Sequence, residues 1–536
     1  MIRKNRIVRI SIVLLTFMVL IGCTGKQESK VQQIQQESGK LTNLKILSTV
    51  NPDRRDEFPS MWFWTELEKK TGVRVDWDLV ADAEWNTRIS LLFASMDLPD
   101  VIKTGTSQLD VEEYGVSQKL LVPLDPYIKD HMPNYHSRLY LNNADKAIYS
   151  SDGKMYYVGG LIAQNVNHQG HDYINKTWLD RLGLAIPKTI EELTEVLRAF
   201  RDRDPNGNGR RDELPLIAGS LAFHTAGIYP HFAKFGVPMH QSGLPGAYAS
   251  LTENEKVIFS TEYPGFRDAV EWLAMCYNEG LMDKESLTLT ESNMIARVNT
   301  NVSGYFVYLR MLNTNLVPDI YNQFVPILPP ASKYGVRVPR LYEVAKQDAI
   351  ITVANKYIAQ TCEWLDAQLE TETMMVGWNG PIRAGAPIEP TMKINSQGKY
   401  EITYVPPNNG LASIVPILQA QFFAPGDYYF EIYEMPPHRV ERYNASQDYL
   451  KAGVLEPYSY TILEQLIKPS NEDAIELSRL YVDIDKLMQE SLAEFFRSGV
   501  TDARYNVFLS SLNNVGVSRY VSLLQKYYDA YAAGLK

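Results

Sequence analysis

The chain has 536 residues, of which 45% are hydrophobic and 11% aromatic, so it has the composition of a globular protein and the length for two or more hydrophobic cores. Its formal net charge is −10 at pH 7, and no basic cluster follows the N-terminal segment. This charge favours solubility and argues against a protein that binds nucleic acid.

The N-terminus has the pattern of a signal peptide. Four basic residues among the first nine precede an apolar run at 10–21. This run is too short to cross a bilayer, which takes about 20 apolar residues. Its length and its flanking charge are those of the first two regions of a signal peptide. We therefore predict a signal peptide at residues 1–22.

The apolar run ends at Leu20-Ile21-Gly22-Cys23, and a small residue before such a cysteine resembles the lipobox of bacterial lipoproteins. That resemblance implies transfer of a diacylglyceryl group to the Cys23 thiol, cleavage after Gly22, and a lipid-anchored protein at the extracytoplasmic face of the cell membrane. Two acyl chains anchor a protein stably. Residues 23–43 are then the lipidated cysteine and a polar tether that cannot bury enough apolar surface to fold.

The first folded segment, 44–158, alternates between strand and helix patterns. In chain order we predict a strand at 44–50, a helix at 60–70 closed by Thr71-Gly72, a strand at 73–80, a helix at 84–96 and a strand at 98–103. This β-α-β-α-β order predicts an α/β lobe with mainly parallel strand pairing.

A second lobe is predicted at 159–300, where new strand and helix patterns begin near Tyr173. Thr189 and Glu192 form a capping box for a helix that extends to Phe200. Further patterns predict a helix at 266–279 and a strand at 302–308. We expect residues 301–345 to return to the first lobe, and 346–536 to be mainly second lobe with C-terminal helices that stop near Gly499 and Gly516.

Besides Cys23, the chain has only Cys276 and Cys362, both in helical patterns. Outside the cytoplasm a disulfide between them is allowed. Their spacing does not point to one, and we expect two buried free thiols.

Between the helix after Thr189 and the next strand lies a loop rich in oxygen ligands. Oxygen side chains alternate along this loop, and glycines at 207 and 209 allow sharp turns. Calcium takes six to eight oxygen ligands from flexible loops, so we predict a structural Ca²⁺ site at 204–213, formed by Asp204, Asn206, Asn208, the Arg210 carbonyl, Asp212 and Glu213. An EF-hand register that starts at Asp202 and a plain Asx-rich turn are the alternatives.

Several runs spread along the chain resemble family 1 extracellular solute-binding lipoproteins of carbohydrate ABC importers, in the long subgroup of oligosaccharide and alginate binders. The most specific run is 173–184 followed by 187–193; the others are 92–102, 121–128 with 132–134, 152–156, 278–283 and 495–499. Met96 stands before Asp97 where the family usually has glycine, and residues 346–385 fit only loosely.

This resemblance implies a fold and a function. The fold class is α/β, similar to type II periplasmic binding proteins, with two lobes, a hinge and a ligand cleft between the lobes. The implied function is capture of an oligosaccharide and its delivery to the permease subunits of an ABC transporter. We expect a monomer that is not an enzyme, that contacts the membrane through its lipid alone and that binds no nucleic acid.

Residues after parallel strands are the candidates for ligand contact, because loops at the carboxyl ends of such strands face the binding crevice. These candidates are Asp53, Arg54, Thr104 and Thr106, with Gln164, Asn167 and His168 just past the expected crossing between lobes. Aromatic side chains could stack on sugar rings. We nominate Trp62, Tyr305 and Trp378 with Asn379, of which the last two lie between Gly377 and Gly380.

Two other functions remain open at this point. A peptide-binding or sensor lipoprotein would share the signal peptide and the two lobes. A lipid-anchored enzyme that degrades polysaccharide would need convergent carboxylates, and no sequence motif nominates a pair of them. His168 and His171 lie close together, but their spacing does not match a zinc site.

Overall fold

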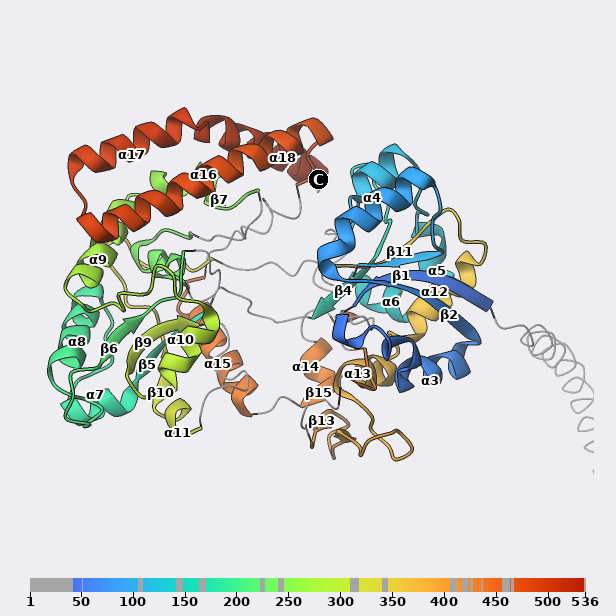
Figure 1. The fold of residues 1–536 in the computed structure, drawn as a ribbon, viewed down its shortest axis with the longest axis horizontal. Coiled ribbons are helices and arrows are strands. Elements are labelled where there is room, and N and C mark those ends of the chain that lie inside the picture. Colours follow the sequence, from blue (N-terminus) through green and yellow to red (C-terminus); the bar gives the residue numbers. More distant parts are fainter. Residues whose placement is uncertain are drawn as a thin grey trace, which may run out of the picture.

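The computed structural model describes two lobes that lie side by side (Figure 1). It describes residues 42–50, 52–104, 109–140, 148–162, 170–221, 227–239, 245–308, 318–339, 346–404, 411, 413–416, 423–424, 428–434, 437–455, 463 and 467–534. The signal peptide, Cys23 and almost the whole tether therefore lie outside the described residues. Among those residues, no helix combines the length and apolar character that a bilayer crossing requires.

The first lobe is built on a six-stranded sheet with the order β14-β4-β11-β3-β1-β2. Its strands are β1 (Thr42–Thr49), β2 (Val73–Val80), β3 (Val101–Lys103), β4 (Val158–Ile162), β11 (Lys346–Ile351) and β14 (Phe423–Ala424). As predicted, β1 pairs in parallel with β2 and β3. In contrast, β11 runs antiparallel to both β3 and β4.

Helices flank this sheet, with α4 on one side and α3 and α13 on the other (Figure 1). The helices of the first lobe are α3 (Trp62–Thr71), α4 (Trp85–Ser95), α5 (Asp125–His131), α6 (Pro133–Leu139), α12 (Ile358–Ala367), α13 (Thr371–Asn379) and α14 (Tyr428–Ile432), with short turns η1 (Pro52–Arg54), η2 (Phe58–Ser60), η3 (Asp82–Glu84) and the π-helical η4 (Glu112–Ser117). Gly72 ends α3 in the left-handed conformation, with φ of 69°, as its position predicted. A small sheet of β12 (Met392–Ile394), β13 (Tyr400–Ile402) and β15 (Tyr433–Glu434) completes the lobe.

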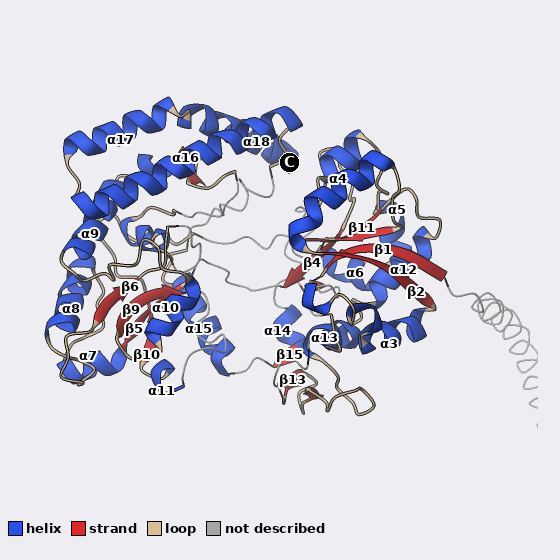
Figure 2. Cartoon of the chain, viewed as in Figure 1, coloured by secondary structure: helices blue, strands red, loops and turns tan. Residues whose placement is uncertain are grey.

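The second lobe has a four-stranded sheet with the order β10-β5-β9-β6 (Figure 2). Its strands are β5 (His171–Asn175), β6 (Leu214–Ile217), β9 (Ser303–Tyr308) and β10 (Phe324–Ile327), and a hairpin of β7 (Ala249–Leu251) and β8 (Val257–Phe259) stands apart. Its helices are α7 (Lys176–Leu182), α8 (Ile190–Asp202), α9 (Phe266–Asn278), α10 (Glu291–Val298), α11 (Pro318–Tyr321), α15 (Pro437–Lys451), α16 (Asn471–Ser498), α17 (Asp502–Asn514) and α18 (Val517–Gly534), with turns η6 (Tyr229–Phe235) and η7 (Ser260–Glu262).

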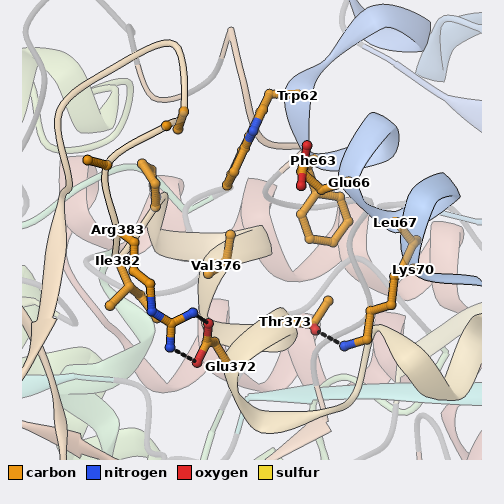
Figure 3. Close-up of a pocket in the computed structure, with 14 residues that line it drawn as sticks. Trp62, Phe63, Glu66, Leu67, Lys70, Glu372, Thr373, Val376, Ile382 and Arg383 are labelled. Carbon is orange, nitrogen blue, oxygen red and sulfur yellow. Dashed lines mark hydrogen bonds and ion pairs between the residues drawn. The ribbon is translucent and has the colours of Figure 1, made fainter.

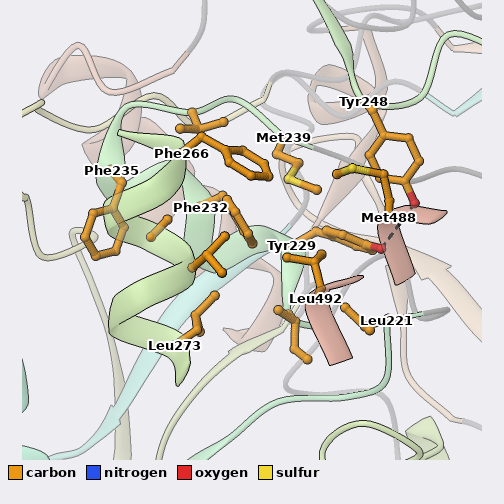
Figure 4. Packing of buried hydrophobic residues seen from close by; sticks show 14 of the residues in the cluster. Leu221, Tyr229, Phe232, Phe235, Met239, Tyr248, Phe266, Leu273, Met488 and Leu492 are labelled. Atoms are coloured by element: carbon orange, nitrogen blue, oxygen red, sulfur yellow. Dashed lines mark hydrogen bonds between the residues drawn. The ribbon is translucent and has the colours of Figure 1, made fainter. Parts of the chain in front are cut away.

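Each lobe has its own hydrophobic core, because the two large clusters of buried side chains share no residue. In the second lobe, α9, α16 and η6 contribute much of the core, and Phe232, Phe266 and Leu492 are all fully buried (Figure 4). Cys276 and Cys362 are buried free thiols, as expected, and lie in different cores. Two cores in one chain are what the length predicted.

Along the described residues, the chain changes lobe three times, after Ile162, after Pro339 and after Glu434. This differs from the predicted boundaries. The described residues of the predicted return at 301–345 stay in the second lobe, because β9 and β10 pair with β5 in the second sheet. The return is made by β11, and the described part of 346–434 belongs to the first lobe rather than the second. The first lobe also extends to Ile162, since β4 pairs with β11.

Candidate functional site

One edge of the first-lobe sheet gathers the ends of three strands. Because β1 and β3 are parallel and β11 is antiparallel to both β3 and β4, the carboxyl ends of β1, β3 and β4 and the start of β11 share this edge. Two of the three passages between lobes begin or end here, after β4 and before β11. In open α/β sheets ligands bind beyond this edge, so the residues that follow β1 and β3 are the first candidates.

Asp53 and Arg54 lie at this edge, in the turn η1 that follows β1. Asp53 is exposed and Arg54 is partly buried. One guanidinium nitrogen of Arg54 is buried without a hydrogen-bond partner in the described structure. Burial lowers the pKa of Arg54, and the nearby charge of Glu57 opposes that effect. The pair therefore offers a carboxylate acceptor and an unused donor, which suits hydroxyl groups of a ligand.

Thr104 also lies at this edge but is fully buried. Its hydroxyl donates to the Gln347 carbonyl at 2.6 Å, and its backbone N–H donates to the Asp348 carbonyl at 2.9 Å. Both groups are thus engaged in holding β3 to β11, so Thr104 supports the edge and does not extend from it. The other candidates near the edge, Thr106, Gln164, Asn167 and His168, lie outside the described residues.

A buried charge pair beside Thr104 was not predicted. The Lys103 ammonium lies 3.4 Å from an Asp348 carboxylate oxygen, and the two side chains are 0% and 9% exposed. Burial lowers the pKa of Lys103, while Asp348 raises it. The only sequence signal was a lysine at the end of an otherwise apolar strand.

The second lobe has a corresponding edge, formed by the start of β5 and the ends of β6 and β9. Asp172 in β5 is the centre of a buried network there. The Lys234 ammonium lies 2.7 Å from Asp172, and the Tyr449 hydroxyl donates to the same carboxylate at 3.1 Å. Tyr305 donates to it as well. Like Lys103, these charges would be costly to bury unpaired.

Tyr305 therefore belongs to the core in this structure and not to an open ligand surface. Its side chain is 0% exposed, its hydroxyl is engaged by Asp172, and the Lys234 ammonium lies 5.7 Å from its ring centre. The sequence nominated Tyr305 as an aromatic residue that could stack on a sugar ring. Instead both faces of β9 are covered, and all six of its residues are buried.

Trp378 and Asn379 lie in the last turn of α13. Trp378 is partly buried against the first core, so its ring does not stand free. Asn379 donates from its side-chain nitrogen to the Met375 carbonyl at 3.2 Å. The helix continues through Gly377 because Met374 and Met375 are fully buried and fix its position.

Trp62 lies at the start of α3 and lines a cavity of about 420 Å³ between α3, α13 and the loop at 381–386 (Figure 3). This α3–α13 groove is also lined by Glu66, Lys70, Glu372, Ile382 and Arg383. In contrast, Trp64 packs inside the first core against Trp77 and Trp364. Every residue that lines the groove belongs to the first lobe.

The predicted calcium loop brings most of its residues together. One Asp204 oxygen accepts from the Asn208 N–H and the other from the Gly209 N–H, at 3.1 and 3.0 Å. The Asn206 and Asn208 side-chain amides both face one oxygen of Asp212. Gly207 and Gly209 have φ of 71° and 74°, a conformation that glycine adopts without strain.

Glu213 distinguishes this loop from an ordinary Asx-rich turn. Its side chain is 9% exposed, and neither carboxylate oxygen has a hydrogen-bond partner in the described structure. Burial raises the pKa of Glu213; the nearby backbone N–H groups of Glu213 and Asp212 oppose this effect, while the charges of Asp204 and Asp212 add to it. Asn301, whose carbonyl accepts from Asn206, also buries an unpaired side-chain oxygen. These oxygens suit a hard cation, although no described group of three His, Cys, Asp or Glu side chains converges on a metal position.

Residues 52–375 match the family of bacterial extracellular solute-binding proteins. The chain belongs to this family. A solute-binding protein carries a ligand without transforming it, so this membership also confirms a binding protein rather than an enzyme. The resemblance inferred from the sequence, and the two-lobed α/β fold that it implied, are confirmed.

This solute-binding protein has relatives of known function. It is 25% identical over 98% of both chains to the fructooligosaccharide ABC transporter substrate-binding protein FusA of Streptococcus pneumoniae serotype 4, strain TIGR4. It is 26% identical to the lipoprotein LipO of Bacillus subtilis strain 168 over 51% of this chain and 50% of LipO.

Solved structures of relatives share the fold. The structure of FusA in complex with kestose covers 92% of this solute-binding protein and 100% of that chain, with a TM-score of 0.69 and 22% identity. FusA has also been solved as an EF-hand mutant. The alginate-binding protein AlgQ2, solved without calcium ion, covers 92% of this chain and 98% of its own, with a TM-score of 0.62 and 22% identity.

Proposed function

We propose that this solute-binding protein captures an oligosaccharide between its two lobes and delivers it to the permease of an ABC transporter. The observation that carries the proposal is the relation to FusA over the full length of both chains, since FusA is an ABC transporter substrate-binding protein for fructooligosaccharides. The polar groups of Asp53 and Arg54 at the first-lobe edge suit sugar hydroxyls.

Capture requires the lobes to close on the ligand. A ligand that contacts both sheet edges binds the closed arrangement more tightly than the open one and shifts the population toward it. The two independent cores allow the lobes to move as separate bodies. A permease that recognises the closed arrangement then receives only loaded protein.

The proposal is tested with a panel of kestose, alginate oligosaccharides and a mixture of short peptides. A bound ligand raises the melting temperature by mass action, corresponding to about 2.7 kcal/mol at a ligand concentration of 100 Kd. We expect one of the sugars to raise the melting temperature and to decrease the radius of gyration in solution scattering. Stabilisation by peptides alone would favour the peptide-binding alternative.

We also propose that the protein is held at the membrane by a lipid on Cys23. The lipobox-like sequence supports this anchor, as does the relation to the lipoprotein LipO. In cells, Cys23→Ala should abolish incorporation of labelled palmitate and release the protein from the membrane fraction or leave it uncleaved. The opposite result, unchanged labelling and fractionation, would refute the anchor.

The third part of the proposal is a structural Ca²⁺ held by the loop at 204–213. The buried, unpaired oxygens of Glu213 support it, and the solved relatives include an EF-hand mutant of FusA and a form of AlgQ2 without calcium. The ion would neutralise charge in the loop and link α8 to β6, with no role in ligand chemistry.

Glu213→Gln tests the ion, because its effect should change sign with calcium. In chelator, the variant removes a buried carboxylate without a partner and should raise the free energy of unfolding by about 1–3 kcal/mol. In calcium, it removes a ligand and should lower the free energy of unfolding relative to the parent. Asp204→Asn should abolish the effect of chelator on the melting temperature, while Asp202→Asn, outside the preferred register, should retain it. Equal melting curves of the parent with and without calcium would refute the site.

A further inference from the structure

The α3–α13 groove is a cavity that the interlobe mechanism does not use. Its volume of about 420 Å³ is within the ~300–1,000 Å³ range of small-molecule sites. The groove is bounded by α3 on one side and by α13 and the loop at 381–386 on the other (Figure 3). Because it lies within one lobe, a ligand could enter it in the open or the closed arrangement.

Trp62 lines this groove and packs in part against the first core. No hydrogen bond or ring contact joins its indole to any residue that the structure describes, and the side chain is only partly buried. Figure 3 shows its ring across the groove from Ile382 and Arg383. Two residues further along α3, Trp64 packs against Phe58, Phe63, Trp77 and Trp364. Trp62 thus presents an apolar ring face and an unused N–H donor to the cavity.

The rim of the groove is polar, but its charges are already paired. Arg383 binds both oxygens of Glu372. Lys70 binds Glu370 and donates to the Thr373 hydroxyl at 2.8 Å. A charged ligand would have to break these pairs, whereas a neutral ligand with many hydroxyls can accept and donate around them.

We propose that the α3–α13 groove is a second carbohydrate-binding site, in which the Trp62 ring stacks on one sugar ring and the Glu372–Arg383 pair binds its hydroxyls. The ligand class agrees with the proposed function and rests on it in part, but binding in the groove requires no closure of the lobes. The groove holds a neutral saccharide on the first lobe while the interlobe site is empty or filled.

The test uses the full chain labelled with 5-fluorotryptophan. Trp62→Phe assigns the fluorine resonance of Trp62, and kestose and a neutral mannose oligosaccharide are the probes. We expect at least one probe to move the Trp62 resonance in a saturable titration. Trp62→Ala should weaken this second binding event roughly tenfold when it is measured by calorimetry. Trp378→Phe, a change at a tryptophan packed on the first core, is the matched control and should leave the event unchanged.

A second variant keeps the test decisive if Trp62→Ala perturbs the fold. Glu66→Ala changes a half-exposed side chain on the same rim and should also weaken the event. If neither probe moves the Trp62 resonance, the groove is not a site for neutral sugars. If a probe moves the Trp62 resonance but leaves the radius of gyration unchanged, the result supports the groove as a sugar site and refutes the interlobe site. Lobe closure with a fixed Trp62 resonance would refute the groove alone.

Discussion

Each lobe buries a lysine–aspartate pair whose aspartate lies on the strand at which a passage between the lobes arrives, but the two pairs are built differently. In the second lobe, Lys234 lies 2.7 Å from Asp172, on the strand that follows the first passage. In the first lobe, Lys103 lies 3.4 Å from Asp348, on the strand that follows the second passage. Both lysines are 0% exposed.

The difference lies in what surrounds the carboxylate. Asp172 accepts hydrogen bonds from Tyr305 and Tyr449 in addition to Lys234, so the network joins β5, β9, α15 and η6. The contact between Lys103 and Asp348 joins the neighbouring strands β3 and β11. The second-lobe network therefore ties four elements together through one carboxylate.

Lys234→Met should have the largest effect on stability. It leaves the buried Asp172 carboxylate without a counter-charge, and breaking such a pair costs about 3–5 kcal/mol of the free energy of unfolding. Chemical denaturation measures the loss. Lys333→Met, which removes an exposed lysine paired with Asp268, is the control and should change stability by less than about 1 kcal/mol.

Lys103→Met should be less damaging than Lys234→Met, by at least about 1 kcal/mol. At this longer distance the attraction to Asp348 offsets less of the desolvation cost of the buried Lys103 ammonium. Replacing Lys103 also removes that desolvation cost, so the net loss of stability is smaller. The same denaturation experiment compares the two variants. A loss equal to or greater than that of Lys234→Met would contradict the difference between the lobes.

His231 makes the second-lobe network sensitive to pH. Burial, and then the charge of Lys234, hold the pKa of His231 well below its usual value of 6.5. Below pH 6.5 the unfolded chain takes up a proton that the folded protein does not, so stability falls as the pH decreases toward the folded pKa. His231→Asn should reduce this slope by up to about 1.4 kcal/mol per pH unit. Denaturation midpoints between pH 5 and 7.5 would measure the slope, and equal slopes would contradict a buried neutral histidine.

Asp53→Ala should have the smallest effect on stability, within about 0.5 kcal/mol, because this side chain is exposed at the first-lobe edge. Its effect should instead be on affinity for a sugar that closes the lobes, measured by calorimetry. Asp56→Ala, another exposed carboxylate in the same loop, should leave affinity unchanged. Equal affinities of the parent and Asp53→Ala would remove Asp53 from the interlobe site.

Local periodicity predicted the elements well but not their partners. The strand at 73–80 and the helices that stop near Gly499 and Gly516 occur as expected, since each depends on spacing and end signals within one segment. The strand at 302–308 was also found, but it was assigned to the wrong sheet. Nothing local decides whether an apolar strand pairs with β5 or with β3, because its partner is distant in sequence.

Residues of the candidate site could be predicted only where the order of the strands alone fixes their position. The position of Asp53 after β1 followed from strand order. The buried lysine–aspartate pairs could not be predicted from strand order. A lysine in a strand usually indicates an exposed position, and its aspartate lies far along the chain. Trp378 shows the converse error: it was nominated to stack on a sugar ring, but it lies in a helix that the buried Met374 and Met375 hold against the first core.

The position of β11 has a consequence for how the protein is made. This strand fills the middle of the first-lobe sheet, between β3 and β4, and the Lys103–Asp348 contact spans 245 residues of sequence. Until the chain has emerged beyond Ile351, β3 has an open edge and β4 lacks the strand that joins it to the rest of the sheet. Long-range pairing of this kind is slow, and exposed strand edges promote aggregation. The central sheet of the second lobe lies within 171–327 and can assemble first. We therefore expect the first lobe to be the part of the nascent chain that most needs a chaperone.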